Sequence, residues 1–120
     1  MTKATIYHNP RCSKSRQTLE ILKTNNIEVE EIRYLDSPPS KATLKSLCKM
    51  MDINPKDIVR TGEALFKELG LAQSYKETSL NDDEWLTILV ENPRLIERPI
   101  VQIGNQAVIG RPPENVLSLI

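Results

Sequence analysis

A strand pattern, a helical pattern and a second strand pattern follow one another within the first 34 residues of the chain. Residues 3–8 (KATIYH) carry β-branched and aromatic side chains and stop at an Asn-Pro turn signal. Helix formers dominate from residue 13 to about residue 25, with leucines recurring on one face. Residues 28–34 (EVEEIRY) return to β character. This order predicts a right-handed β-α-β unit whose two strands are parallel.

The rest of the chain adds a helical segment and a second pair of strands. Ser40 is expected to cap a helix, and further short helices are expected between residues 54 and 91, the clearest over residues 81–91. Residues 99–109 read PIVQI, Gly-Asn and QAVI, which predicts an antiparallel hairpin, and residues 111–120 predict a final helix. The order β-α-β, helical insertion, β-β-α is the thioredoxin-like arrangement within the α/β class.

Length and charge limit the classes of function. The 120 residues suit a single domain spanning residues 1–120. Sixteen basic and sixteen acidic side chains cancel, so the overall charge favours neither nucleic acid nor an anionic membrane as a partner. No apolar run approaches the roughly 20 residues of a membrane span, and the N-terminus lacks the apolar core of a signal peptide. We therefore expect a cytoplasmic protein with no nucleic-acid or membrane partner.

The two cysteines, Cys12 and Cys48, are expected to differ in role. Two are too few for a disulfide scaffold, and their separation has no metal-ligand spacing, so both should be free thiols and no metal site is expected. Cys48 falls on the apolar stripe of the helix that follows Ser40, together with Leu44 and Leu47, and is expected to be a buried packing residue. Cys12 lies instead at the predicted strand-to-helix junction.

The loop around Cys12 carries an excess of positive charge. Arg11, Lys14 and Arg16 surround the thiol, and His8 precedes it at the strand end. Unpaired amides at the start of a helix, the helix dipole and these cations would all lower the pKa of the thiol, and a thiolate is the nucleophilic form. The same amides could hold an oxyanion beside the sulfur. The stretch therefore predicts a reactive cysteine.

Two kinds of cysteine chemistry do not fit this loop. A dithiol redox protein would carry Cys-x-x-Cys, but Ser15 occupies the second cysteine position, so an external thiol must resolve any adduct on Cys12. A phosphatase-type loop would need an arginine at position 18, where this chain has Thr18. The external-thiol interpretation remains.

Four motifs in the same order resemble the glutaredoxin-coupled arsenate reductases of the ArsC family. They are HNPRCSKSR near the N-terminus, IVRTGEALFKELGLA over residues 58–72, ERPIV, and IGRPPE near the C-terminus. The chain is most similar to the shorter branch of that family. The resemblance implies a thioredoxin-like fold with a helical insertion and the reduction of arsenate to arsenite. It also implies glutathione as co-substrate, glutaredoxin as partner and no bound cofactor.

The resemblance also implies roles for individual residues. Cys12 matches the family nucleophile, and Arg60, Arg98 and Arg111 match its arginines, which are expected to converge on one sulfur and offset the charge of the oxyanion. His8, Ser15 and Arg16 of the cysteine motif are expected to bind substrate or tune the pKa of the thiol. The peptide bond before Pro99 is expected to be cis, as thioredoxin-like folds usually have it.

Other interpretations stay open beside this one. Taken singly, Arg60 at a helix end could bind the last carbonyl groups of that helix. A Spx-like regulator that binds RNA polymerase has the same fold, although such proteins usually carry a Cys-x-x-Cys switch. A monothiol glutaredoxin-like protein would also have serine at position 15, as Ser15 is here, but would lack the long insertion.

Overall fold

The computed structural model describes residues 3–77 and 79–120, which fall into two compact units. The first unit runs to Ser37 and resumes over Arg98–Ile120, and the second is Pro38–Glu97. The expectation of one domain over residues 1–120 stays a prediction. Within the described ranges, no helix is long and apolar enough to cross a membrane.

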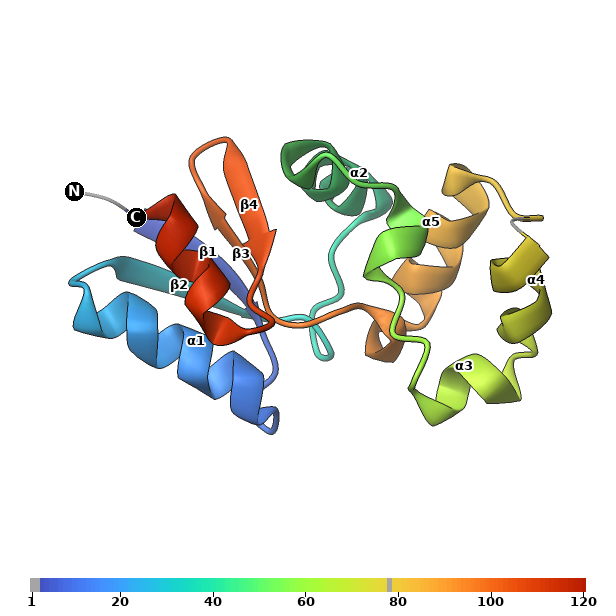
Figure 1. Ribbon diagram of the computed structural model, residues 1–120, viewed down its shortest axis with the longest axis horizontal. Helices are drawn as coiled ribbons and strands as arrows, with labels where there is room; N and C mark the ends of the chain where they lie inside the picture. Colours follow the sequence, from blue (N-terminus) through green and yellow to red (C-terminus); the bar gives the residue numbers. More distant parts are fainter. Residues whose placement is uncertain (1–2, 78) are drawn as a thin grey trace. The chain divides into compact units, whose positions relative to one another are not determined.

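The first unit is a four-stranded sheet with helices (Figure 1). The sheet order is β2-β1-β3-β4, with β1 and β2 parallel and the other two pairs antiparallel. Its elements are β1 (Lys3–His8), α1 (Ser13–Thr24), β2 (Glu28–Arg33), β3 (Ile100–Ile103), β4 (Gln106–Ile109) and the 3-10 helix η3 (Pro113–Leu119). The predicted β-α-β and β-β-α halves and the thioredoxin-like arrangement are confirmed.

Alternation along the strands builds the core of this unit. Ala4 and Ile6 of β1 and Val101 of β3 are fully buried, and they cluster with Leu22 of α1 and Val116 of η3. Successive side chains of a strand point to opposite faces of the sheet, so the alternating residues of β1 put one face against α1 and η3. This packing holds α1 and η3 against one face of the sheet.

Most expected element boundaries in the first unit hold. The strand predicted over residues 28–34 ends one residue earlier, at Arg33, and the hairpin turns at Gly104, whose φ of +61° is one that glycine adopts without strain. The final helix forms with Pro113 in its first turn, and it is a 3-10 helix.

The second unit consists of helices and short connections. They are α2 (Lys41–Met51), η1 (Pro55–Ile58), α3 (Ala64–Glu68), α4 (Leu71–Glu77), α5 (Asp82–Glu91) and η2 (Pro93–Leu95). The Ser40 hydroxyl accepts from the N–H of Thr43 at 3.1 Å, as its predicted capping role requires. Asn81 and Glu84 form the predicted capping box at the start of α5. Trp85 is buried in the core.

A close approach at Gly110 ties the C-terminal segment to α1 within the first unit. The N–H of Gly110 donates to the carbonyl of Pro99 at 2.8 Å. A Cβ atom at Gly110 would lie 2.6 Å from Thr18 Oγ1 and 3.0 Å from Pro99 Cγ, so only glycine fits without movement. The Arg98–Pro99 peptide is cis, as predicted, and so is Arg111–Pro112, which the sequence analysis did not anticipate.

Candidate functional site

Cys12 occupies the N-cap position of α1, directly after the loop that follows β1. Its N–H donates to the carbonyl of Asn9 at 2.9 Å, and its own carbonyl accepts from the N–H of Arg16 at 3.0 Å. The bond to Asn9 closes the loop, and the bond from Arg16 is the first backbone hydrogen bond of the helix. The partly exposed thiol therefore sits at the positive end of α1, as the sequence predicted.

The pKa of Cys12 is lowered from its ordinary value of 9.0. Burial acts in the opposite direction and is the largest single effect, but interactions of the sulfur with the N–H of Ser15, the guanidinium of Arg98 and the N–H of Lys14 together outweigh it. The thiolate is thus stabilised by N–H groups at the start of α1 and by Arg98, which is far from Cys12 in the sequence but contacts its sulfur. The side chains of Arg11, Lys14 and Arg16, which the sequence suggested for this purpose, are not among these causes.

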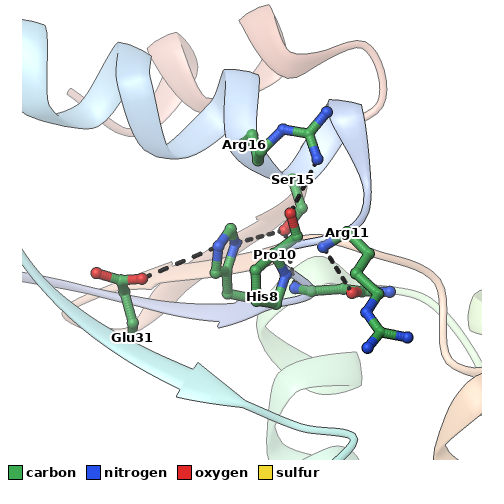
Figure 2. A network of polar contacts seen from close by, with 7 residues as sticks. His8, Pro10, Arg11, Ser15, Arg16 and Glu31 are labelled. Carbon is green, nitrogen blue, oxygen red and sulfur yellow. Dashed lines mark hydrogen bonds and ion pairs between the residues drawn. The ribbon is translucent and has the colours of Figure 1, made fainter.

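Ser15 links His8 to the cysteine loop (Figure 2). Its hydroxyl lies 2.7 Å from His8 Nδ1 and accepts from the N–H of Asn9 at 3.1 Å. Both Ser15 and His8 are buried, with 0% and 3% of their surface exposed. Ser15 therefore orients the loop through its side chain while its N–H group faces the sulfur.

His8 does not carry the positive charge that the sequence analysis suggested. Burial is the main reason that its pKa is lowered from 6.5, and this outweighs the opposing effect of Glu31, whose Oε1 lies 3.9 Å from Nε2. With the proton on Nε2, Nδ1 accepts from the Ser15 hydroxyl, whose oxygen in turn accepts from the N–H of Asn9. His8 contacts the loop as a neutral ring.

The two arginines of the loop point in different directions. Arg16 Nη1 donates to the carbonyl of Pro10 at 2.9 Å, so this guanidinium bridges the first turn of α1 and the loop. Figure 2 shows the Arg11 side chain extending away from that bond. Arg16 thus holds the loop backbone, and its predicted role in binding substrate stays a prediction.

Arg98 and Arg111 are brought to the same end of the first unit as Cys12. Arg98 precedes β3 and contacts the Cys12 thiol. Arg98 Nε is buried and has no hydrogen-bond partner within the part of the chain that the structure describes. Arg111 follows Gly110, whose bond to Pro99 joins the two arginine-bearing segments. The Arg98 guanidinium therefore contacts the thiol while its Nε is enclosed by protein atoms.

Arg60 belongs to the second unit, where it pairs with carboxylates. Its Nη1 lies 2.8 Å from Glu63 Oε2, and its Nε lies 3.6 Å from Glu97 Oε1. Arg94, whose Nη2 lies 2.8 Å from Glu63 Oε1, completes the group. Arg60 lies after η1 and pairs with side chains, so the helix-capping alternative does not describe it. Its expected action on an oxyanion stays a prediction.

The second cysteine has the opposite character. Cys48 is buried in α2, and burial, with Asp57 and Asp82 adding to it, raises the pKa of its thiol to about 11. It therefore stays a neutral thiol at physiological pH. The sequence-based assignment of Cys48 to packing agrees with this setting.

Sequence reasoning missed two residues that support the site. Thr18 is buried on α1 against Gly110 and also donates from Oγ1 to the carbonyl of Lys14 at 2.8 Å. It follows Ser15 by three residues and precedes Leu22 by four, a helical spacing that could have marked it as inward-facing. Glu31 on β2 gave no comparable signal, because its approach to His8 depends on strand pairing.

The arrangement suits attack by a thiolate on an anion. A stabilised thiolate, helix amides beside it and a guanidinium in contact with the sulfur offer a nucleophile and positive partners for oxygen atoms. The described residues contain no group of three or more histidine, cysteine or acidic side chains placed to hold a metal ion.

Known proteins and one protein-family model match this chain over nearly its whole length. The model of the ArsC family matches residues 7–119. An arsenate reductase of Neisseria meningitidis is 38% identical over 97% of this chain and 97% of that protein. The uncharacterised protein YfgD of Escherichia coli (strain K12) is 48% identical over 96% of this chain and 94% of that one. The solved structure of an arsenate reductase from Vibrio cholerae is 42% identical, with a TM-score of 0.91 and coverage of 99% and 98%.

Proposed function

The chain belongs to the ArsC family, and on that premise we propose that it is an oxidoreductase that reduces arsenate to arsenite, with glutathione and glutaredoxin as reductants. Arsenate is a tetrahedral oxyanion, so its reduction needs a nucleophile that can approach negative charge. Arsenate reductases that this chain resembles over its full length support the substrate.

One observation carries the proposal: the Cys12 thiol lies at the start of α1 and against the Arg98 guanidinium. Both neighbours favour the thiolate, and both present N–H donors to an oxyanion that approaches the sulfur. The contact between the Arg98 guanidinium and the Cys12 sulfur is the geometry that supports the proposal.

The chemistry proceeds in three steps. The Cys12 thiolate attacks arsenic(V), a sulfur–arsenic bond forms, and one arsenic–oxygen bond of protonated arsenate breaks; the oxygen leaves as hydroxide, which a proton from solvent converts to water. Glutathione thiolate then bonds to the Cys12 sulfur, the electron pair of the sulfur–arsenic bond stays on arsenic, and arsenite leaves. A glutaredoxin thiolate finally attacks the glutathione sulfur and returns Cys12 as thiolate. Two electrons reach arsenic, and the first two steps leave Cys12 in a mixed disulfide.

Arginine charge offsets the repulsion between thiolate and arsenate in the first step. Arg98 contacts the Cys12 thiol and is proposed to supply this charge, and Arg111 is proposed to contribute to it. Charge developing on oxygen as the adduct forms is stabilised by such fixed guanidinium groups, which are also able to bind two oxygens at once.

A coupled assay tests the proposal. Arsenate-dependent NADPH consumption is followed with glutathione, glutaredoxin and glutathione reductase, for the natural chain, Cys12→Ser and Cys48→Ser. Turnover that Cys12→Ser abolishes and Cys48→Ser retains is expected. Equal turnover by Cys12→Ser would reject the proposed nucleophile, and absence of arsenate-dependent turnover in every variant would reject the substrate.

A further inference from the structure

A small cavity lies beside the cysteine loop in the first unit. Its volume is about 290 Å³, and it is lined by residues 8–11 together with Arg33, Leu35 and Asp36. Residue 11 directly precedes Cys12, and consecutive Cα atoms are about 3.8 Å apart, so the cavity wall ends one residue from the reactive thiol.

Three charged side chains, those of Arg11, Arg33 and Asp36, line the cavity. No ion pair within the described residues involves the side chains of Arg11, Arg33 or Asp36. All three residues are exposed, and none belongs to the buried core. Two guanidinium groups and one carboxylate therefore line a hollow next to the nucleophile, and the exposed Leu35 adds an apolar side chain to the lining.

From this cavity we infer a binding subsite for the thiol co-substrate, glutathione, and the inference rests on the proposed function. Glutathione carries two carboxylates and one ammonium group, which match two guanidinium groups and one carboxylate in number and sign. Arg11 and Arg33 bind the carboxylates, and Asp36 binds the ammonium group. A volume near 300 Å³ is at the lower end of small-molecule sites, which suits the peptide ends while the thiol reaches toward Cys12.

The position of the subsite explains how glutathione is brought to the Cys12 sulfur for the second step of the reaction. Binding energy from groups remote from the sulfur places the glutathione thiol beside Cys12 and replaces a chance encounter with a held geometry. A thiol without carboxylates gains nothing from the arginines. Discrimination between charged and neutral thiols is therefore the property that the subsite confers.

Thiol–disulfide exchange with glutathione disulfide tests the subsite without arsenate. The Cys12 thiolate attacks one sulfur of the disulfide, forms the mixed disulfide and releases one glutathione thiolate. The rate is measured by mass spectrometry for the natural chain, Arg33→Ala and Lys67→Ala, with bis(2-hydroxyethyl) disulfide as the neutral comparison. Lys67 is exposed on α3 and lines no part of the cavity, so it controls for loss of one surface charge.

Arg33→Ala should react with glutathione disulfide at least fivefold more slowly and with the neutral disulfide at an unchanged rate, while Lys67→Ala changes neither. Equal slowing with both disulfides, or no slowing with glutathione disulfide, overturns the subsite. Normal glutathionylation combined with slower recycling by glutaredoxin also overturns it, because the cavity would then serve a protein partner. Because no arsenate is present, these outcomes are independent of arsenate turnover, on which the proposed function is tested.

Discussion

The guanidinium of Arg98 stabilises the thiolate of Cys12 by hydrogen bonding and by charge. The two residues are far apart in the sequence, and the pairing of β1 with β3 brings their segments together. Burial of the sulfur opposes ionisation. The lowered pKa of Cys12 therefore depends on the hydrogen-bond donors around the sulfur, Arg98 among them. Cys12 should therefore lose reactivity when this arginine is changed.

Arg98→Ala should raise the pKa of Cys12 and slow its alkylation by iodoacetamide at pH 7 by about tenfold, the lower end of what a hydrogen bond to a charged group contributes. Arg98→Lys keeps the charge and loses the planar fork, so an intermediate rate is expected. Lys14→Ala is the control, because only the backbone N–H of Lys14 acts on the sulfur. Equal slowing by Lys14→Ala would contradict this account.

Ser15→Ala should destabilise the protein by about 1–3 kcal/mol, because it leaves the N–H of Asn9 and Nδ1 of His8 without the partner that each now has. Ser13, in the first turn of the same helix, is exposed, and Ser13→Ala should change stability by less than about 0.5 kcal/mol. Urea unfolding of both variants measures the difference. Equal stability of the two would show that the buried hydroxyl contributes nothing.

The lowered pKa of His8 makes stability depend on pH. Between the folded pKa and the ordinary 6.5, the unfolded chain binds more protons at this ring than the folded chain does. Stability should be fully present above pH 6.5 and fall as the pH drops from there toward the folded pKa, by at most about 1.4 kcal/mol per pH unit.

The His8→Gln variant isolates this dependence. Its free energy of unfolding, measured in urea at several values from pH 7 to pH 5, should fall less on acidification than that of the natural chain. Glutamine retains polar atoms that can bond to Ser15. An equal fall in both proteins would assign the acid sensitivity to other groups.

Gly110→Ala should destabilise the protein by about 1–3 kcal/mol, the usual cost of forcing atoms into a packed site, because the new Cβ would meet Thr18 and Pro99. A Cβ added at Gly62 would meet no atom within 4 Å, and Gly62 has no positive φ, so Gly62→Ala should be neutral or slightly stabilising. Thermal unfolding of the two variants gives the comparison. If Gly110→Ala were as stable as Gly62→Ala, the close packing of Thr18 and Pro99 against Gly110 would not require glycine there.

Local patterns predicted much of the fold and the position of the nucleophile. The Asn9-Pro10 turn signal between a β pattern and a run of helix formers was enough to put Cys12 at the start of a helix. The apolar stripe that contains Cys48 and the Asn81–Glu84 capping box were likewise readable, because each depends on residues a few positions apart.

Contacts between distant segments were not readable in the same way. The bare sequence put cations around Cys12, whereas the structure draws on helix N–H groups and on Arg98 from the start of β3. The sequence suggested that His8 could be positively charged, because the residues around it do not indicate that it is buried. Burial is the main cause of its lowered pKa. The contact between Gly110 and Thr18 depends on tertiary packing, so no local pattern could reveal it.

A single-turnover experiment tests the central claim most directly. The protein is mixed with arsenate and glutathione in the absence of glutaredoxin, and arsenite is quantified while the mass of the chain is recorded. We expect one arsenite per protein molecule and one glutathione disulfide-bonded to Cys12, with neither product in Cys12→Ser. Arsenite formation by Cys12→Ser, or arsenite without a mixed disulfide on Cys12, would contradict the mechanism.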